Sequence, residues 1–362
     1  MGKGSKKLKV GILGATGMVG QRFVTLLDNH PWFEVTLLAA SPRSSGKTYQ
    51  EAVDGRWKIE ETLPNSIKNL VVKRVVEDKE KIAREVDFVF CALDMDNGKT
   101  KEIELWYAKN DIPVISTNSA HRWSEDVPMI IPEINPQHLA LIDKQRQNHG
   151  WKRGFIAVKP NCSLQSYLPL IWALGEFEPK EVSVTTMQAV SGAGKTLSDW
   201  PEMTENVIPF INGEEEKTEQ EPLKILGRLK NGHISQAQYP RISATCIRVP
   251  VSDGHLAAVA VSFKKKPTRT QILSSVKNAA NPLQKWHLPS APNPFIYYFG
   301  DDNRPQTRLD RDFGRGMGIT FGRLREDKQF DWKFVALSHN TIRGAAGGAV
   351  LTAELLKAKG YL

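Results

Sequence analysis

The sequence predicts an α/β protein with two domains: an N-terminal doubly wound parallel sheet, and a C-terminal α+β domain with a mainly antiparallel sheet. Through residue 158, short apolar strands alternate with helical segments, a pattern typical of a parallel sheet covered by helices. From Lys159 on, longer strands follow one another through tight turns. We therefore place residues 1–158 in the first domain and 159–338 in the second. The last stretch, 339–362, is expected to return to the first domain as a helix.

The N-terminal half contains five apolar runs of strand length. Helical periodicity is clearest in residues 18–29, where Val19, Phe23 and Leu26 fall on one face. A second helix is expected over residues 99–109. The expected strands cover residues 9–13, 34–40, 71–76, 87–93 and 113–117.

The second half is richer in long β segments. Val182 and Val184 alternate with Ser183 and Thr185, which is the two-residue period of a half-buried strand. Helices are expected over residues 164–174 and 341–357, and the second begins with alanines and glycines that suit close packing. The expected strands cover residues 181–190, 242–249, 256–263, 317–324 and 332–337.

The composition narrows the class of protein. The longest apolar runs are strand-sized, and the basic N-terminus lacks the apolar core of a signal peptide, so we expect no membrane segment and a cytoplasmic location. The formal net charge is +9, but the basic residues are scattered rather than interleaved with aromatics. This favours an anionic cofactor and substrate over nucleic acid. The three cysteines form no C-x-x-C pair, and no spacing indicates a disulfide framework or a metal site.

A glycine-rich turn lies between the first expected strand and the first helix. Gly14, Gly17 and Gly20 allow a tight turn and a close approach of the backbone to a pyrophosphate, which then meets the free N–H groups of the helix. The pattern indicates a dinucleotide site in a Rossmann-like domain. Its expected contacts are Gly14, Ala15, Thr16, Gly17, Met18 and Val19.

The end of the second strand indicates which dinucleotide binds. NAD-binding domains usually place an acidic residue there to hold the ribose hydroxyls. Here the stretch 39–47 contains no acid and offers Ser41, Arg43 and Ser44, which suit a 2′-phosphate. The sequence therefore predicts NADP, with Leu93 at the end of a later strand as a further contact.

Gly194-Lys195-Thr196 resembles the end of an ATP-binding P-loop. That motif requires a glycine at position 189, which is Ala189. We therefore do not expect an ATPase.

Cys162 is the candidate nucleophile. With Asn161 as the N-cap of the helix that follows, Cys162 would lie in its first turn, where the helix dipole and free N–H groups lower a thiol pKa and can stabilise an oxyanion. Cys91 and Cys246 lie inside apolar strands and are expected to be inert.

His255 is the candidate acid/base partner. It follows a tight turn and begins a strand, seven residues after Arg248, so both side chains can reach one pocket from adjacent strands. A structural hydrogen bond is an equally good explanation of a lone histidine at such a position.

Six motifs in order resemble the aspartate-semialdehyde dehydrogenase family over nearly the whole chain. Arg-Val-Pro-Val-x-Asp-Gly-His and the Ser-Leu after the cysteine are similar to its archaeal and fungal branch. The motifs are Gly14–Gly20, Pro160–Ser163, Gln188–Gly194, Glu221-x-x-Lys224, Arg248-x6-His255 and Asn340-x-x-Arg343-Gly-Ala-Ala-Gly-Gly.

The resemblance implies a role for each motif residue. Cys162 would be the nucleophile, His255 the acid/base, and Gln188 would orient the tetrahedral intermediate. Arg248 would bind the substrate α-carboxylate, Glu221 its amine, and Lys224 with Arg122 the phosphate, next to Asn161. Without the resemblance, Glu221 and Lys224 would be taken for an ordinary surface ion pair. The expected contacts to the nicotinamide half are Ser191, Gly192, Gly194 and Asn340.

The resemblance also implies the reaction: NADP-dependent exchange of aspartyl phosphate for aspartate semialdehyde through a Cys162 thioester, in lysine, threonine and methionine biosynthesis. A homodimer or homotetramer is expected. The rivals are a malonyl-CoA reductase on the same scaffold, which needs no amine-binding acid, and a non-catalytic NADP-sensing protein. N-acetyl-γ-glutamyl-phosphate reductase and glyceraldehyde-phosphate dehydrogenase share the chemistry but fit the motifs less well.

Overall fold

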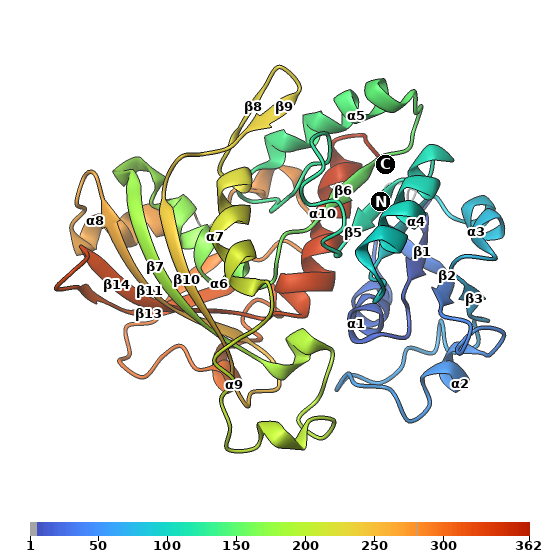
Figure 1. Ribbon diagram of the computed structural model, residues 1–362, viewed down its shortest axis with the longest axis horizontal. Helices are drawn as coiled ribbons and strands as arrows, with labels where there is room; N and C mark the ends of the chain where they lie inside the picture. Colours follow the sequence, from blue (N-terminus) through green and yellow to red (C-terminus); the bar gives the residue numbers. More distant parts are fainter. Residues whose placement is uncertain (1–5, 280) are drawn as a thin grey trace, which may run out of the picture.

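The computed structural model describes residues 6–279 and 281–362 and contains two principal sheets (Figure 1). The first sheet has six parallel strands in the order β3-β2-β1-β4-β5-β6. The chain runs outward from β1 to β3, crosses back, and runs outward again from β4, so the strand order reverses between β1 and β4. Ligands bind at such a switch point in doubly wound sheets. The strands are β1 (Leu8–Leu13), β2 (Phe33–Ala40), β3 (Lys73–Arg74), β4 (Phe88–Cys91), β5 (Val114–Ser116) and β6 (Ile156–Val158).

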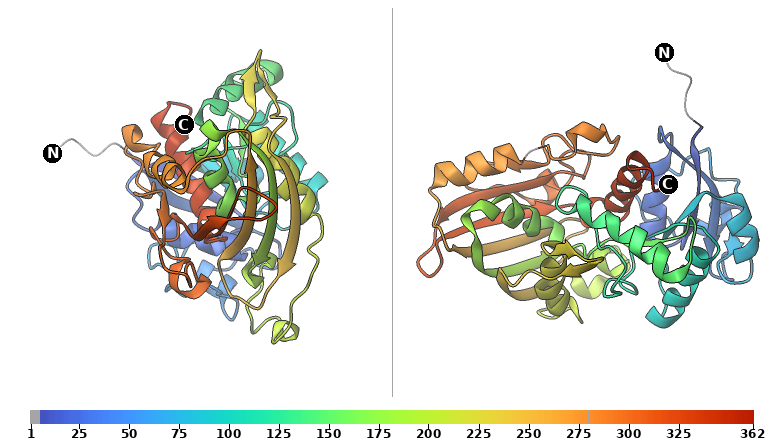
Figure 2. Two further views of the ribbon diagram at one scale, coloured as in Figure 1. Left: turned by 90° about the vertical axis from the view of Figure 1, so that its left-hand side faces the viewer. Right: turned by 90° about the horizontal axis from the view of Figure 1, so that it is seen from above.

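Helices pack on both faces of this sheet, whose central strands β4 and β5 are fully buried and whose β1 is buried from Val10 on. One core joins β1 and β4 with the C-terminal helix α10 (Gly347–Ala358), which also contacts α1 (Met18–Leu27). Seen from above, α10 lies between the two lobes, beside the first sheet (Figure 2). The remaining helices of this half are α2 (Tyr49–Val53), α3 (Lys79–Glu85), α4 (Asn97–Lys109) and α5 (Leu141–His149).

The second sheet has six strands in the order β10-β7-β11-β14-β13-β12. Three of its five pairings are antiparallel, while β10 with β7 and β12 with β13 are parallel. The predicted fold class is confirmed, with these two parallel pairs as the added detail. The strands are β7 (Pro179–Gln188), β10 (Arg241–Arg248), β11 (His255–Phe263), β12 (Ile296–Tyr298), β13 (Ile319–Glu326) and β14 (Trp332–Ser338).

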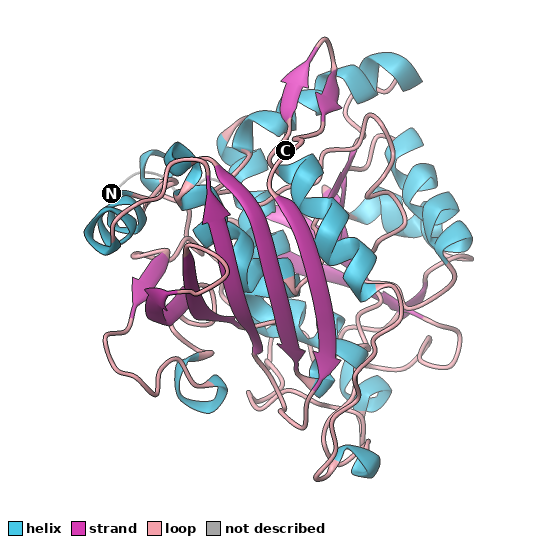
Figure 3. Ribbon diagram, turned by 60° about the vertical axis from the view of Figure 1, so that its left-hand side comes forward, coloured by secondary structure: helices cyan, strands magenta, loops and turns pink. Residues whose placement is uncertain are grey.

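Helix α6 (Leu164–Ala173) is the central packing element of this half. Its side chains are almost all buried, and it contacts β11, β13 and β14 as well as α8 (Arg269–Asn278). Helix α7 (Glu214–Ile225) lies against β10. In Figure 3 the long strands of the sheet lie in front, with helices behind and beside them. Two short strands, β8 (Arg228–Lys230) and β9 (His233–Ser235), form a separate hairpin, and α9 (Thr307–Asp310) is a single turn.

Three sequence expectations are corrected. The first helix ends at Leu27, because Asp28 leaves the helical region. The strand expected over residues 71–76 is reduced to β3, with an isolated bridge between Val71 and Thr48. The helix expected from residue 341 begins as a π-helix over Ile342–Ala346 and becomes regular in α10. Within the described residues, no helix is long and apolar enough to cross a membrane.

Candidate active site

A cavity of about 870 Å³ receives residues from both halves of the chain. The glycine turn after β1, the turn after β4, the loop after β5, Cys162 and the N-terminus of α7 all contribute to its wall. The loop after β7 and the segment after β14 close it from the side of the second sheet. The cavity therefore lies at the carboxyl ends of the strands of both sheets.

The glycine turn adopts a conformation that requires its glycines. Gly14 has φ of +87°, and a Cβ there would collide with the carbonyl oxygen of Ala92. A Cβ on Gly20 would collide with the carbonyl of Gly14. Thr16 and Gly17 line both the large cavity and a second cavity of about 360 Å³, so the turn connects the two. Met18 and Val19 line the large cavity, while Ala15 is buried beneath the turn.

The residues predicted for a 2′-phosphate are only partly brought together. Ser41 lines the second cavity, together with Leu93. Ser44 is buried, and its Oγ accepts a hydrogen bond of 3.2 Å from Arg56 Nη2. In the described part of the chain, Arg56 rather than Arg43 lines this cavity, and it lines the large one as well. Sequence reasoning missed Arg56 because it lies beyond α2, outside the stretch where the motif is sought.

Cys162 lies in the turn between β6 and α6. The helix begins at Leu164 with Ser163 as the N-cap, and Asn161 Oδ1 accepts a hydrogen bond of 3.1 Å from the Ser163 amide. The expectation that Asn161 caps the helix and places Cys162 in its first turn is therefore wrong, because the side chain of Asn161 closes a turn that precedes the helix.

The ionisation of Cys162 also differs from the expectation. The thiol is half-buried at the cavity wall, and desolvation raises its pKa to about 11, with the Glu214 carboxylate adding to the rise. Positive charges on Lys159, Arg122 and Arg248 act in the opposite direction. Desolvation thus outweighs the effect of these three positive charges on the thiol pKa.

His255 lies behind the sulfur. Its Nε2 is 3.4 Å from Cys162 Sγ, and its Nδ1 accepts a hydrogen bond of 3.1 Å from the Ala189 amide. Because Nδ1 accepts, the neutral ring carries its proton on Nε2, facing the sulfur. Burial, reinforced by Arg248, lowers the pKa of His255 to about 3, so the imidazole is neutral near pH 7.

Strand register brings Gln188, Arg248 and His255 to one end of the sheet. Gln188 pairs with Arg248 across β7 and β10, and its neighbour Met187 pairs with Leu256 at the start of β11. Arg248 Nη1 donates to the carbonyl of Ala189 at 2.7 Å. A Cβ on Gly192 would lie 2.9 Å from that nitrogen and 3.2 Å from His255 Cε1, so a larger residue here requires the Arg248 guanidinium to shift.

The loop containing Ser191, Gly192 and Gly194 lines the cavity, as does Asn340. Asn340 connects the loop after β7 with the turn before β11. Its Nδ2 donates to Ser191 Oγ at 2.8 Å, and its Oδ1 accepts from the Gly254 amide at 2.8 Å. Lys58 bridges from the first half of the chain by donating to the Gly194 carbonyl at 2.9 Å.

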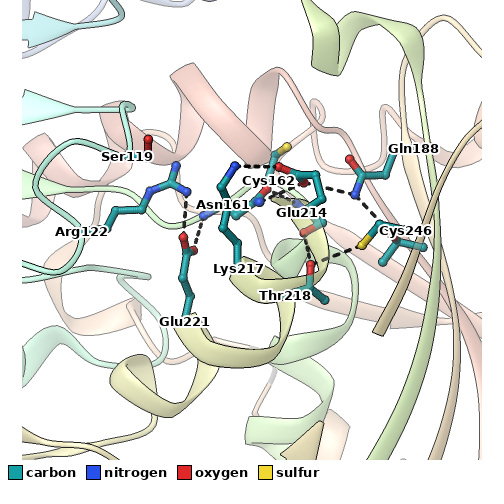
Figure 4. Close-up of polar contacts among 12 residues, drawn as sticks. Ser119, Arg122, Asn161, Cys162, Gln188, Glu214, Lys217, Thr218, Glu221 and Cys246 are labelled. Carbon is teal, nitrogen blue, oxygen red and sulfur yellow. Dashed lines mark hydrogen bonds and ion pairs between the residues drawn. The ribbon is translucent and has the colours of Figure 1, made fainter. Parts of the chain in front are cut away.

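The predicted Glu221–Lys224 pair is fully or nearly fully buried, and it takes no part in the cavity wall that the described residues form. Glu221 receives hydrogen bonds from Arg122 Nη1 at 2.8 Å and from the Asn161 amide at 2.7 Å (Figure 4). Lys224 Nζ donates to three backbone carbonyls, those of Arg122, Ser124 and Val127. The pair is therefore neither the surface ion pair that spacing alone suggests nor a group open to a ligand here. It holds the loops that carry Arg122 and Cys162.

Glu214 and Lys217 occupy the position expected of Glu221 and Lys224. They have the same i, i+3 spacing seven residues earlier on α7, they line the cavity, and they are 3.2 Å apart. Glu214 Oε2 accepts from Asn161 Nδ2 at 2.9 Å and from Gln188 Nε2 at 3.3 Å (Figure 4). The acidic run at residues 214–216 was the available signal, since a second Glu-x-x-Lys begins there.

Arg122 lines the cavity but is held by the protein on three sides. Besides Glu221, it donates to the carbonyls of Thr117 and Lys159. Cys91 and Cys246 are buried in β4 and β10, as expected. The described residues contain no group of histidines, cysteines and carboxylates that could hold a metal ion.

Comparison with known proteins identifies the family. A family model described as semialdehyde dehydrogenase, NAD binding domain, matches residues 9–142, and one described as semialdehyde dehydrogenase, dimerisation domain, matches residues 168–343. The aspartate-semialdehyde dehydrogenase of Archaeoglobus fulgidus is 44% identical over 97% of this chain and 98% of its own length. That of Aspergillus fumigatus is 41% identical over 98% and 99%. A crystal structure of the Candida albicans enzyme with NADP is 36% identical and superposes with a TM-score of 0.87, covering 98% of this chain and all of that one. The resemblance seen in the sequence is confirmed, and the chain belongs to the aspartate-semialdehyde dehydrogenase family.

Proposed function

We propose that this protein converts L-aspartyl-4-phosphate to L-aspartate-4-semialdehyde, and the reverse, with NADP and a covalent thioester on Cys162. The observation that carries the proposal is the position of the thiol. Cys162 lies on the wall of the same cavity that the glycine turn opens into, with a proton of His255 directed at its sulfur. A nucleophile beside a dinucleotide site is what thioester reduction requires.

The proposed reaction begins with attack of the Cys162 thiolate on the acyl carbon, and the C–O bond to phosphate breaks. A bound NADPH would supply the hydride that reduces the thioester carbon, and the oxyanion so formed on the substrate would collapse to the aldehyde and release the Cys162 thiolate. His255, as the acid of the pair, presents its Nε2 proton first to the sulfur and then to the developing oxyanion. Gln188, which lies beside Glu214, is proposed to orient this adduct.

For the substrate, we propose Arg248 as the partner of the α-carboxylate and Glu214 as the partner of the amine. Glu214 replaces Glu221 in this role because its carboxylate lines the cavity and Glu221 is enclosed by Arg122 and Asn161. Lys217 replaces Lys224 for the same reason and would bind phosphate together with Arg122. Two cations at this place favour phosphate over water as the acceptor of the acyl group in the reverse direction.

The residues present fit NADP. The glycine turn supplies a helix N-terminus for the pyrophosphate, and Ser41 with Arg56 offers a hydroxyl and a guanidinium where a 2′-phosphate would lie. Gly192, Gly194 and Asn340 would hold the nicotinamide half near Cys162. The complex of the Candida albicans relative with NADP supports this assignment.

We propose a homodimer formed through the second sheet, since residues 168–343 match a family model described as a dimerisation domain. Family membership also supports the proposed place in lysine, threonine and methionine biosynthesis and a cytoplasmic location.

The test is phosphate-dependent reduction of NADP with L-aspartate-4-semialdehyde, comparing the wild type with Cys162→Ala. Turnover that requires phosphate and is lost in the variant supports the proposal. Oxidation of NADPH by malonyl-CoA, with no turnover of the semialdehyde, would assign the chain to the reductase rival. NADP binding without any thiol-dependent turnover would assign it to the non-catalytic rival.

A further inference from the structure

Lys159 is a buried cation that the proposed mechanism does not use. It follows β6 directly and precedes Cys162 by three residues. Its side chain is 3% exposed, and its Nζ has no hydrogen-bond partner among residues 6–279 and 281–362. A buried ammonium without a partner is costly, so its retention calls for a function.

The side chain is held next to Cys162 by the start of the C-terminal helix. A Cβ on Gly344 would lie 2.7 Å from Cys162 Cβ, and a Cβ on Gly348, four residues on, would collide with Lys159 Cε. Because residues four apart lie on one face of a helix, Cys162 and Lys159 pack side by side on the same glycine surface. Cys162 meets the cavity, while Lys159 lies behind it in the protein.

The other charges around Lys159 are already matched. Arg343, from the π-helix, makes a bidentate ion pair with Glu133 at 2.6 and 2.7 Å. Arg122, from the loop after β5, pairs with Glu221 of α7. No carboxylate is thus left free for Lys159 among the described residues that act on it electrostatically, and the remaining ionisable neighbour is the thiol of Cys162.

The charged groups around the Cys162 sulfur also have partners of their own. Glu214 interacts with Lys217, and Arg248 is bound to the Ala189 carbonyl. His255 is neutral with Nδ1 occupied by the Ala189 amide, so it can donate a hydrogen bond to the thiolate but supplies no positive charge. Of the three cations that stabilise a thiolate at Cys162, Arg122 and Arg248 are held by hydrogen bonds to other groups, and among the described residues Lys159 has no such partner.

We propose that Lys159 is a positioning residue for the thioester chemistry: its ammonium is the internal counter-ion of the Cys162 thiolate. Ionising either group alone leaves an isolated charge in the interior, whereas the thiolate and the ammonium together offset each other. This inference rests on the proposed function of Cys162 as a nucleophile.

Burial opposes the charged form of both groups, whereas the charge of each group favours the charged form of the other. Burial, followed by Arg343, lowers the pKa of Lys159 to about 7, and the charge of Cys162 acts to raise it. On Cys162, whose pKa burial raises, Lys159 is the first of the groups that act to lower it. Each group thus favours the charged form of the other.

The test measures ionisation of Cys162 without substrate. The rate of alkylation by iodoacetamide is followed from pH 5 to pH 11 by mass spectrometry of the peptide that carries Cys162. In Lys159→Met, the whole profile should shift to higher pH by about one unit or more, so that alkylation at pH 7 slows about tenfold. Lys159→Arg, which keeps the charge, should recover most of the rate. The pH profile of kcat should shift in the same direction, so that kcat at pH 7 is lower while KM is unchanged.

A matched control is Lys357→Met, which removes a half-buried lysine of α10 whose Nζ donates to the Trp32 carbonyl and which does not line the cavity. The pH profile of Cys162 alkylation in this variant should coincide with that of the wild type. An unchanged alkylation profile in folded Lys159→Met overturns the inference, and the profile of Lys159→Gln decides if the methionine variant does not fold. Because alkylation needs no substrate, failure of the proposed reaction would appear as absent turnover with the alkylation profiles intact.

Discussion

The burial of Lys159 makes a quantitative prediction about stability. The amine ionises at pH 10.5 in an ordinary setting, and burial lowers its pKa to about 7 in the folded protein. Below pH 7 both the folded and the unfolded chain bind the proton, and burying the ammonium then opposes folding by on the order of 5 kcal/mol, 3.5 units at about 1.36 kcal/mol each. Between pH 7 and 10.5 the folded chain releases the proton while the unfolded chain keeps it, so this cost falls as pH rises.

Lys159→Met removes the cost, so the variant should be more stable than the wild type, and most so at low pH. Its advantage should shrink by on the order of 3 kcal/mol between pH 6 and pH 9. The assay is urea denaturation followed by circular dichroism at half-unit pH intervals, with the free energy of unfolding of both proteins taken at each pH.

A control separates this effect from a general change of charge. Lys81 is exposed on α3, so Lys81→Met should change stability by a small, pH-independent amount. A constant difference between Lys159→Met and the wild type from pH 6 to pH 9 would refute the reasoning, because it would mean that Lys159 does not titrate differently in the two states.

Three further predictions concern the cavity. Arg56→Ala should raise KM for NADP about tenfold or more and change KM for NAD little, whereas Arg43→Ala should have the smaller effect on NADP, in steady-state assays with both cofactors. Glu214→Gln should raise KM for the semialdehyde while melting normally; Glu221→Gln should instead lower stability by about 3 kcal/mol or more, because it breaks a buried pair with Arg122. Gly192→Ala should lower kcat, because its Cβ would displace the Arg248 guanidinium and press on His255, and normal kcat in that variant would contradict the close packing described.

The sequence predicts the fold and the reactive pair because both depend on local pattern. Alternating strands and helices identify the first sheet, and a glycine turn between a strand and a helix can serve few purposes. Cys162 and His255 lie within the motifs that the family resemblance covers, and the structure places them 3.4 Å apart. Such motifs depend on local sequence rather than on tertiary contacts, so they can be predicted from the sequence alone.

Which of the two Glu-x-x-Lys pairs on α7 lines the cavity cannot be predicted from the sequence in this way. Glu214–Lys217 and Glu221–Lys224 share spacing, and seven residues are close to two helical turns, so both pairs lie near one face of α7. What separates them is the position of the cavity along the helix axis, which depends on how α7 lies against β10 and the loop of Arg122. That is a tertiary contact, and no local pattern encodes it.

The ionisation of Cys162 shows a related limit. A cysteine near a helix N-terminus is expected to have a lowered pKa, but the helix begins two residues later, and desolvation of the half-buried thiol raises its pKa instead. Activation of this nucleophile then depends on side-chain charges rather than on the helix. Two of those charges, Arg122 and Arg248, are fixed by bonds to other groups, and their influence on the sulfur is constant. Lys159 alone among the three can gain or lose its charge near neutral pH, so it is the group through which the protein can couple formation of the thiolate to the uptake of a proton.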